Sequence, residues 1–275
     1  GFGSNIQILN FDSNLSLETI PVSDTQAFVP RIQEMDGIRH VQVFATKAGI
    51  IKTAEAIQGV VLKGVGSDFD WDFFRSSIID GRVFTVSDTG RTNDVIISKK
   101  ISDMLRLKTG DSFAMYFVQD PPRSRRFTVS GIYETSLEEF DKMYVFCDIG
   151  HIKRLNGWTD DQVSGFEIFI DDFDRLDEIT LAVRNQVGYK LLEDETKFRV
   201  TNIRLRYPQI FDWLNFQDMN VFIIITLMLL VAGFNMISGL LIIILEKTNM
   251  IGIFMAIGSN NVTIGKIFLY QAAYL

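Results

Sequence analysis

The longest hydrophobic pattern in the chain is an apolar run from Met219 to Leu245 that contains no charged residue. As a helix it would extend about 40 Å at about 1.5 Å per residue, more than the roughly 30 Å hydrocarbon core of a bilayer. Helical periodicity continues upstream to Pro208, which suits the first turn of a helix. The pattern therefore predicts a stalk plus transmembrane helix within residues 206–246.

One face of this predicted helix carries small and weakly polar side chains. Such a face lets a second helix approach closely and offers an interhelical hydrogen bond, so it predicts packing within a helix bundle. The alternative is that Gly and Ser are simply common in membrane helices. The residues of this predicted packing face are Ala232, Asn235, Ser238 and Gly239.

A short helix and the start of another membrane span are predicted next. Within residues 247–261, Thr248 can cap a helix and Gly258 can end it. A segment this short between two spans cannot form a domain, but it can form a helix along the membrane surface. Residues 262–275 resemble the beginning of a further transmembrane helix, so we expect the chain to be a fragment of a longer membrane protein.

Upstream of the membrane segment, strands and helices follow one another as in an α+β domain, which we assign to residues 1–80 and 148–205. Ser23 or Asp24 can cap a helix that runs through Met35. The predicted strands of this domain cover residues 4–11, 40–53, 54–66, 164–170 and 197–203, and its other helices cover 148–157 and 174–187.

Residues 81–147 differ in character, because short strands alternate there with glycine turns. Residues 112–118 and 125–134 alternate well enough for a hairpin, and residues 142–149 for another strand. Since the α+β pattern resumes afterwards, we predict a compact β module inserted into the first domain.

The balance of charge separates the soluble part from the membrane part. The chain has 27 Lys and Arg against 34 Asp and Glu, and of these only Glu246, Lys247 and Lys266 follow Met219. The acidity of residues 1–218 argues against nucleic acid as a partner. Acidic residues precede the span and Lys247 follows it, which favours a cytoplasmic C-terminal side and an external soluble part.

The sequence predicts no catalytic, cofactor-binding or metal site. Cys147 is the only cysteine, which excludes an intramolecular disulfide and every Cys-based metal motif. Residues 68–72, DFDWD, lack the Gly and the distal Glu of a calcium loop and are interpreted as a solvated helix start. Neither His40 nor His151 has a second His or a spaced acid around it, and no nucleophile elbow, P-loop or dinucleotide fingerprint occurs.

The loop of the predicted hairpin, Gln119 to Arg126, combines two prolines with three arginines. The prolines stiffen the loop toward polyproline geometry, and the arginines project from one end. Two hypotheses stay open, an ordinary solvated turn and a docking loop for an acidic partner.

The stretch EKTNMIGIFMAIGSNNVTIGKIFLYQ, residues 246–271, resembles the segment after the second span in FtsX-like ABC-transporter permeases. Residues 212–247 are similar to the lipoprotein-releasing LolC/LolE type of that family. SGFEIFIDD, FTVSGIYE and the opening GFGSNIQI are similar to its MacB-like periplasmic core domain. The resemblance thus covers nearly the whole chain.

This resemblance implies a four-span permease of the bacterial inner membrane, whose first span precedes Gly1 and whose third begins near Ile264. It implies a periplasmic domain with a porter-like α+β part and an inserted sabre-like β part. The implied partners are an ABC ATPase subunit that hydrolyses ATP, a second permease subunit in a homodimer or heterodimer, lipoprotein cargo, and a periplasmic carrier protein.

The resemblance also implies roles for two segments. The helix after the second span couples to the ATPase, and a hook in the sabre hairpin holds the carrier; the present loop occupies that place but is shorter. The implied coupling residues are Glu246, Thr248, Ile251, Gly252, Ile253, Phe254, Ala256 and Gly258. The implied carrier-docking residues are Pro121, Pro122, Arg123 and Arg125.

Other functions compete with lipoprotein release. A related permease would transmit force to a wall hydrolase or export small molecules, and the large external domain argues against the cell-division type. A membrane-tethered enzyme is the third alternative, against which the missing nucleophile and metal motifs argue.

Overall fold

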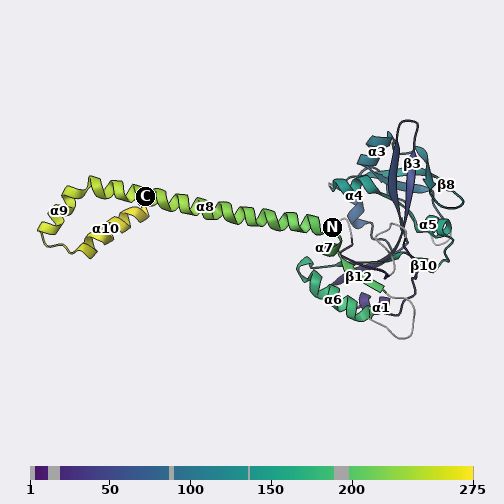
Figure 1. Cartoon of the computed structure of the whole chain (residues 1–275), viewed down its shortest axis with the longest axis horizontal. Helices are drawn as coiled ribbons and strands as arrows, with labels where there is room; N and C mark the ends of the chain where they lie inside the picture. The colour runs from purple at the N-terminus through teal and green to yellow at the C-terminus, as the bar shows by residue number, and fades with distance from the viewer. Residues whose placement is uncertain (1–3, 12–18, 87–89, 136, 189–197, 275) are drawn as a thin grey trace. The chain divides into compact units, whose positions relative to one another are not determined.

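The computed structural model describes residues 4–11, 19–86, 90–135, 137–188 and 198–274. It divides into two compact units, Gly1–Arg206 and Tyr207–Leu275 (Figure 1). Parts of three predicted segments lie outside the described residues: the start of GFGSNIQI, the first residue of the strand over 197–203, and the last residue of the chain.

The first unit begins with an antiparallel sheet that two helices cover on one face (Figure 1). In β1, Ile6 and Ile8 are buried, and Phe28 of α1 meets Phe166 of β11 with ring centroids 5.5 Å apart. The alternating apolar positions of the strands thus face the helices, as the sequence pattern predicts. The strands, in order across the sheet, are β12 (Phe198–Asn202), β1 (Ile6–Asn10), β11 (Gly165–Ile170) and β3 (Ile38–Lys52), and the helices are α1 (Phe28–Gln33) and α6 (Leu176–Val187).

The second half of β3 leaves this sheet and enters a closed ring of strands. The ring closes because β7 pairs with both β3 and β8. Buried side chains of its strands, such as Met115, Phe117 and Phe127, join the main hydrophobic core. The ring runs β3, β4 (Ile57–Val65), β9 (Tyr144–Asp148), β6 (Asp94–Ser98), β8 (Arg123–Tyr133) and β7 (Ser112–Phe117).

Short elements complete the first unit. The strands are β2 (Val22–Ser23), β5 (Ile78–Gly81) and β10 (Gln162–Val163). The helices are α2 (Asp72–Arg75), α3 (Lys99–Leu105), α4 (Glu138–Met143), α5 (Ile149–Asn156), the 3-10 helix Phe173–Arg175 and α7 (Ile203–Arg206).

The predicted hairpin forms, with Ser112–Phe117 paired antiparallel to the start of Arg123–Tyr133. Hydrogen bonds run across the predicted boundary between the α+β part and the inserted β part, because β3 and β4 from the first segment pair with β7 and β9 from the second. The division into a porter-like and a sabre-like part stays a prediction.

The prediction for the first helix was wrong at both ends. Val22–Ser23 pairs with Gln162–Val163, so the chain is extended where the cap was expected, and α1 begins only at Phe28. The hydroxyl of Ser23 accepts a bond from the Thr25 N–H within a turn. The helix ends at Gln33, before the Met35 that was expected to be its last residue.

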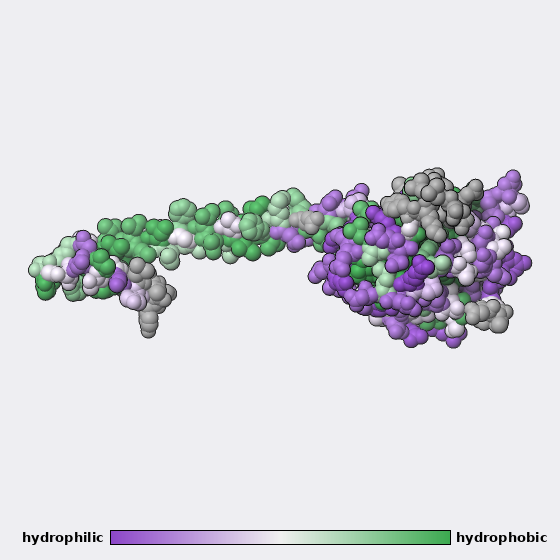
Figure 2. All heavy atoms as spheres, turned by 90° about the horizontal axis from the view of Figure 1, so that it is seen from below, coloured by the Kyte–Doolittle hydropathy of each residue, from purple (hydrophilic) through white to green (hydrophobic). Residues whose placement is uncertain are grey.

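Within residues 207–274, the described part of the second unit, the chain forms three helices: α8 (Pro208–Glu246), α9 (Thr248–Ala256) and α10 (Asn261–Tyr274). Among the described residues, α8 is the one helix long and apolar enough to cross a membrane, with 39 residues and a mean hydropathy of 2.5 over its most apolar window. Figure 2 shows its apolar surface. Pro208 is its first residue, as predicted.

The two ends of α9 differ in how well they match the sequence prediction. The Thr248 hydroxyl caps nothing; it donates to the Leu245 carbonyl at 2.7 Å, so the predicted cap was wrong. The other end is as predicted, because Gly258 adopts φ +94°. Its N–H bonds to Met255 O at 3.0 Å and the Ser259 N–H bonds to Phe254 O at 2.9 Å. This pair of bonds is the Schellman ending, which requires a residue that tolerates positive φ.

Candidate functional site

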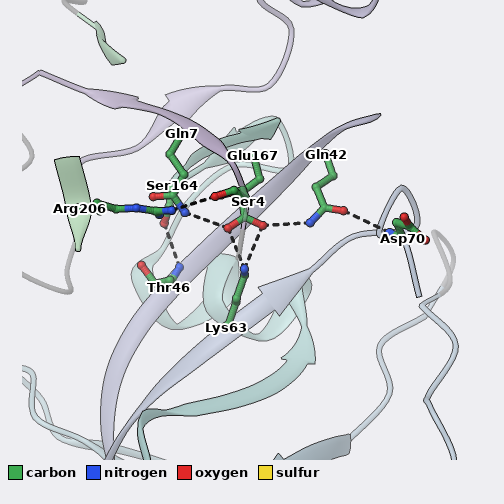
Figure 3. Close-up of polar contacts among 9 residues, drawn as sticks. All are labelled: Ser4, Gln7, Gln42, Thr46, Lys63, Asp70, Ser164, Glu167 and Arg206. Carbon is green, nitrogen blue, oxygen red and sulfur yellow. Dashed lines mark hydrogen bonds and ion pairs between the residues drawn. The ribbon is translucent and has the colours of Figure 1, made fainter. Parts of the chain in front are cut away.

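A row of polar side chains crosses the sheet (Figure 3). It lies on the face opposite α1, because Glu167 follows Phe166, whose ring packs against Phe28 of that helix. Gln7 of β1 lies directly opposite Glu167 of β11, and Glu167 lies directly opposite Gln42 of β3. Both Gln42 and Glu167 are 1% exposed. We call Gln7, Glu167, Gln42 and Lys63 the buried polar row.

Lys63 of β4 supplies the charge that balances Glu167. Its Nζ lies 2.7 and 2.9 Å from the two carboxylate oxygens, and the side-chain amides of Gln7 and Gln42 each donate to the same carboxylate at 2.9 Å. Burial raises the pKa of Glu167, but Lys63, the Gln42 hydrogen bond and the charge of Arg206 outweigh it, so the pKa lies below its usual value. The carboxylate is therefore ionised and held by several donors.

Two hydrogen bonds to backbone groups lie beside the buried polar row, one on each side. The side-chain Oε1 of Gln42 accepts a hydrogen bond from the Asp70 N–H at 3.2 Å. On the other side, the Arg206 guanidinium donates to the Ser4 carbonyl at 3.1 Å. Arg206 is the last residue of the first unit, and its charge helps to lower the pKa of Glu167. This arrangement can fix four strands relative to one another.

Sequence reasoning did not identify the buried polar row. In GFEIFI, Glu167 is the polar member of an alternating strand, which is also the pattern of an exposed residue. A lysine in the otherwise apolar run Val60–Val65 was the available signal, since a charge within a buried strand demands a partner.

The predicted docking loop lies against the end of α5. The Arg123 guanidinium donates to the carbonyls of Arg154 at 3.1 Å and Leu155 at 3.2 Å. The Gln119 amide donates to the same Leu155 carbonyl at 3.3 Å. Pro121 and Pro122 are exposed at the tip, whereas Arg123 and Arg125 are half-buried on the strand that follows. Docking by this loop stays a prediction.

The predicted packing face of α8 is open within the described chain. Ala232, Asn235 and Ser238 are exposed, and Gly239 is half-buried. A Cβ added at Gly239 would meet no described atom within 4 Å, so another helix has room to approach. Which helix does so stays a prediction.

The predicted coupling residues lie on two sides of α9. Ile251 and Phe254 are half-buried. Gly252, Ile253 and Ala256 are exposed, as are the flanking residues Glu246, Thr248 and Gly258. Their role in coupling stays a prediction. A groove of about 410 Å³ beside α9 is lined by Leu240, Ile244, Ile251, Met255, Asn261, Ile264, Gly265 and Phe268.

Within the described residues, no three His, Cys, Asp or Glu side chains gather where they could hold a metal ion. His151 is buried, and its Nε2 lies 2.8 Å from the Thr92 carbonyl oxygen. Burial lowers the pKa of His151, which keeps the imidazole neutral at pH 7. It serves as a core residue packed edge-on against Phe127.

Comparison with known proteins gave no matching family model. Among curated proteins, the chain is 23% identical over 194 residues to the lipoprotein-releasing system transmembrane protein LolC of Xylella fastidiosa strain Temecula1, covering 66% of this chain and 44% of that protein. It is 27% identical over 153 residues to LolC of Neisseria meningitidis serogroup B, covering 56% and 35%. The chain therefore spans less than half the length of these relatives.

Solved structures with some similarity are the extracellular domain of the noncanonic ABC-type transporter YknZ from Gram-positive bacteria and the periplasmic region of MacB from Actinobacillus actinomycetemcomitans. The first is 19% identical with a TM-score of 0.47 and covers 72% of this chain and 99% of that domain. The second is 12% identical with a TM-score of 0.46 and covers 76% and 93%. The curated relatives of this chain are thus LolC-type permeases of lipoprotein-releasing systems, at low identity, which confirms the resemblance predicted from its sequence.

Proposed function

We propose that the chain is part of an inner-membrane permease subunit of an ABC transporter that releases lipoproteins. The names of its relatives support lipoproteins as the transported molecules. The acidic folded unit followed by α8 supports an external domain attached to a membrane span. In this proposal a separate ATPase subunit hydrolyses ATP, a second permease subunit packs against the Ala232–Gly239 face, and residues 1–206 face the periplasm.

The observation that carries the coupling part of the proposal is the exposure of a small-residue stripe on α9. Gly252 and Ala256 are four residues apart on one side of the helix, and both are exposed. A Cβ added at Gly252 would meet no described atom within 4 Å. A partner surface can therefore approach the helix backbone closely there, and ATPase movement would be transmitted through this contact.

The test replaces Ala256 with Trp, which adds bulk on the stripe where overfilling commonly costs about 1–3 kcal/mol. The matched control is Met250→Trp, which adds a similar ring on another side of α9. Pull-down of the ATPase subunit and cargo-stimulated ATP hydrolysis in nanodiscs are the measurements. We expect Ala256→Trp to insert and fold but to lose both, and Met250→Trp to retain them.

Wild-type association and turnover in Ala256→Trp would mean that α9 is only a connector between membrane segments. Proteins that co-purify from intact membranes separate the remaining functions. Co-purification of a lipoprotein and its carrier supports release, and co-purification of a wall hydrolase supports force transmission. If none of these proteins co-purifies, efflux becomes the favoured function.

A further inference from the structure

Arginines from three separate segments gather around α5. Arg123 and Arg125 lie two residues apart on the same face of β8, Arg154 belongs to α5, and Arg91 precedes β6. Arg91 lies over the first turn of α5, because a Cβ added at Gly150 would come within 2.7 Å of Arg91 Cδ. We call Arg91, Arg123, Arg125 and Arg154 the arginine cluster.

The charge of the arginine cluster is not balanced by an ion pair within the described chain: none of these residues forms one there. Arg125 is half-buried, and burial together with the charges of Arg154, Arg123 and Arg91 lowers its pKa. Holding these cations together costs free energy, and a bound anion would offset that cost.

A polar cavity of about 310 Å³ adjoins the cluster. The carbonyl of Leu155 links the two, since it accepts both Arg123 Nη1 at 3.2 Å and Gln119 Nε2 at 3.3 Å. The Gln119 Oε1 atom is buried and has no hydrogen-bond partner among the described residues. Because a buried acceptor without a hydrogen bond costs free energy, this atom favours a ligand that carries a hydrogen-bond donor. The cavity is lined by Thr19, Lys47, Gln119, Leu155, Asn156 and Trp158.

We propose that the arginine cluster and the adjoining cavity bind a phosphate ester whose alcohol part carries a hydroxyl or ammonium group. Guanidinium groups bind phosphate oxygens through paired, charge-assisted hydrogen bonds. The cavity would hold the alcohol part, whose donor would satisfy Gln119 Oε1. A phospholipid headgroup and a free phosphate ester share this chemistry. A hollow of this volume can hold such a small group, whereas a flat acidic protein surface would not fill it.

The experiment measures binding by calorimetry to the full chain in detergent micelles. The probes are sn-glycerol 3-phosphate, sulfate, and dihexanoyl phosphatidylglycerol at fixed ionic strength. We expect saturable binding of glycerol 3-phosphate, with sulfate weaker because it has no donor for Gln119. If dihexanoyl phosphatidylglycerol competes, the ligand is a lipid headgroup. If it does not compete, the ligand is a free phosphate ester.

Arg125→Gln with Arg154→Gln should weaken glycerol 3-phosphate binding at least about tenfold, as for the loss of charge-assisted hydrogen bonds. Arg126→Gln is the control, because Arg126 lies on the opposite, exposed face of β8. The substitution removes one charge, which matches Arg91→Gln, whereas the double variant removes two. Arg91→Gln provides a single, exposed variant should the double variant unfold. Gln119→Leu should weaken glycerol 3-phosphate severalfold and leave sulfate unchanged.

Equal weakening in Arg126→Gln would overturn the proposal, because it would indicate unspecific attraction. The absence of saturable binding by either phosphate ester would do the same. Tighter binding of polyglutamate than of glycerol 3-phosphate would assign the surface to an acidic protein, the partner class first predicted for the Gln119–Arg126 loop.

Discussion

Replacing Lys63 with Met would remove the charge that balances Glu167 while keeping a side chain of similar length. Glu167 is 1% exposed in the present structure, and in the variant the amides of Gln7 and Gln42 would be the remaining side-chain donors to its carboxylate. Removing one member of a buried ion pair commonly costs about 3–5 kcal/mol, because the other charge is left uncompensated. For a unit of this size that loss lowers the melting temperature by roughly 6–20 °C.

The loss of folding stability caused by Lys63→Met should depend on pH. In the wild type the pKa of Glu167 lies below its unfolded value, so the pair contributes stability above that value and loses it as pH falls through the folded pKa. Without Lys63, burial dominates and raises the pKa above the unfolded value of about 4.3. The variant is then least stable at neutral pH, and the difference from wild type should narrow as pH falls toward about 4.

Urea unfolding of residues 1–206 at several pH values measures this difference. Lys52→Met is the control, since Lys52 is exposed on the same strand as Gln42 and should change stability by no more than about 0.5 kcal/mol. Adding Glu167→Gln to Lys63→Met should recover much of the loss, because the buried charge is gone. A loss below about 1 kcal/mol, or one independent of pH, would refute the role assigned to Lys63.

Packing in the first unit makes β4 sensitive to added bulk at one glycine and tolerant at another. Gly64→Ala would bring a Cβ within 2.7 Å of the Ile149 backbone, so it should lower the free energy of unfolding in urea by about 1–3 kcal/mol. Gly59→Ala on the same strand meets nothing within 4 Å and should be neutral or stabilising; equal effects of the two substitutions would contradict this account. Burial raises the pKa of the Cys147 thiol well above its usual value, so a thiol reagent at pH 8 should label the folded protein far more slowly than the urea-unfolded protein, and rapid labelling of both would show that the thiol is accessible.

Local patterns predicted most of the individual strands and helices. The alternation in Ser112–Phe117 and the glycine after Asn156 are sufficient to place a strand and a helix end, because each depends on neighbouring residues alone. The first helix shows where this reasoning fails. Ser23 has the side chain of a cap, but pairing with Gln162 keeps its backbone extended.

The candidate sites were harder to predict because they depend on pairings between distant segments. A buried Glu167 carboxylate is tolerated because Lys63 and Gln42 donate to it from other strands. The loop arginines were identified from composition, yet the contact of Arg123 with the end of α5 needs the register of β8 against β7, which no local pattern contains.

The pairing of the first and last strands sets the order in which the first unit can fold during synthesis. Ile6 of β1 lies opposite Asn202 of β12, so the sheet gains its last strand only when almost the whole unit has been made. Such distant pairings fold slowly. Because α8 begins at Pro208, the ribosome completes the sheet and starts the apolar helix within a few residues of each other. The sheet of the first unit therefore cannot be completed until synthesis has almost reached α8, and slow pairing would extend its folding beyond that point.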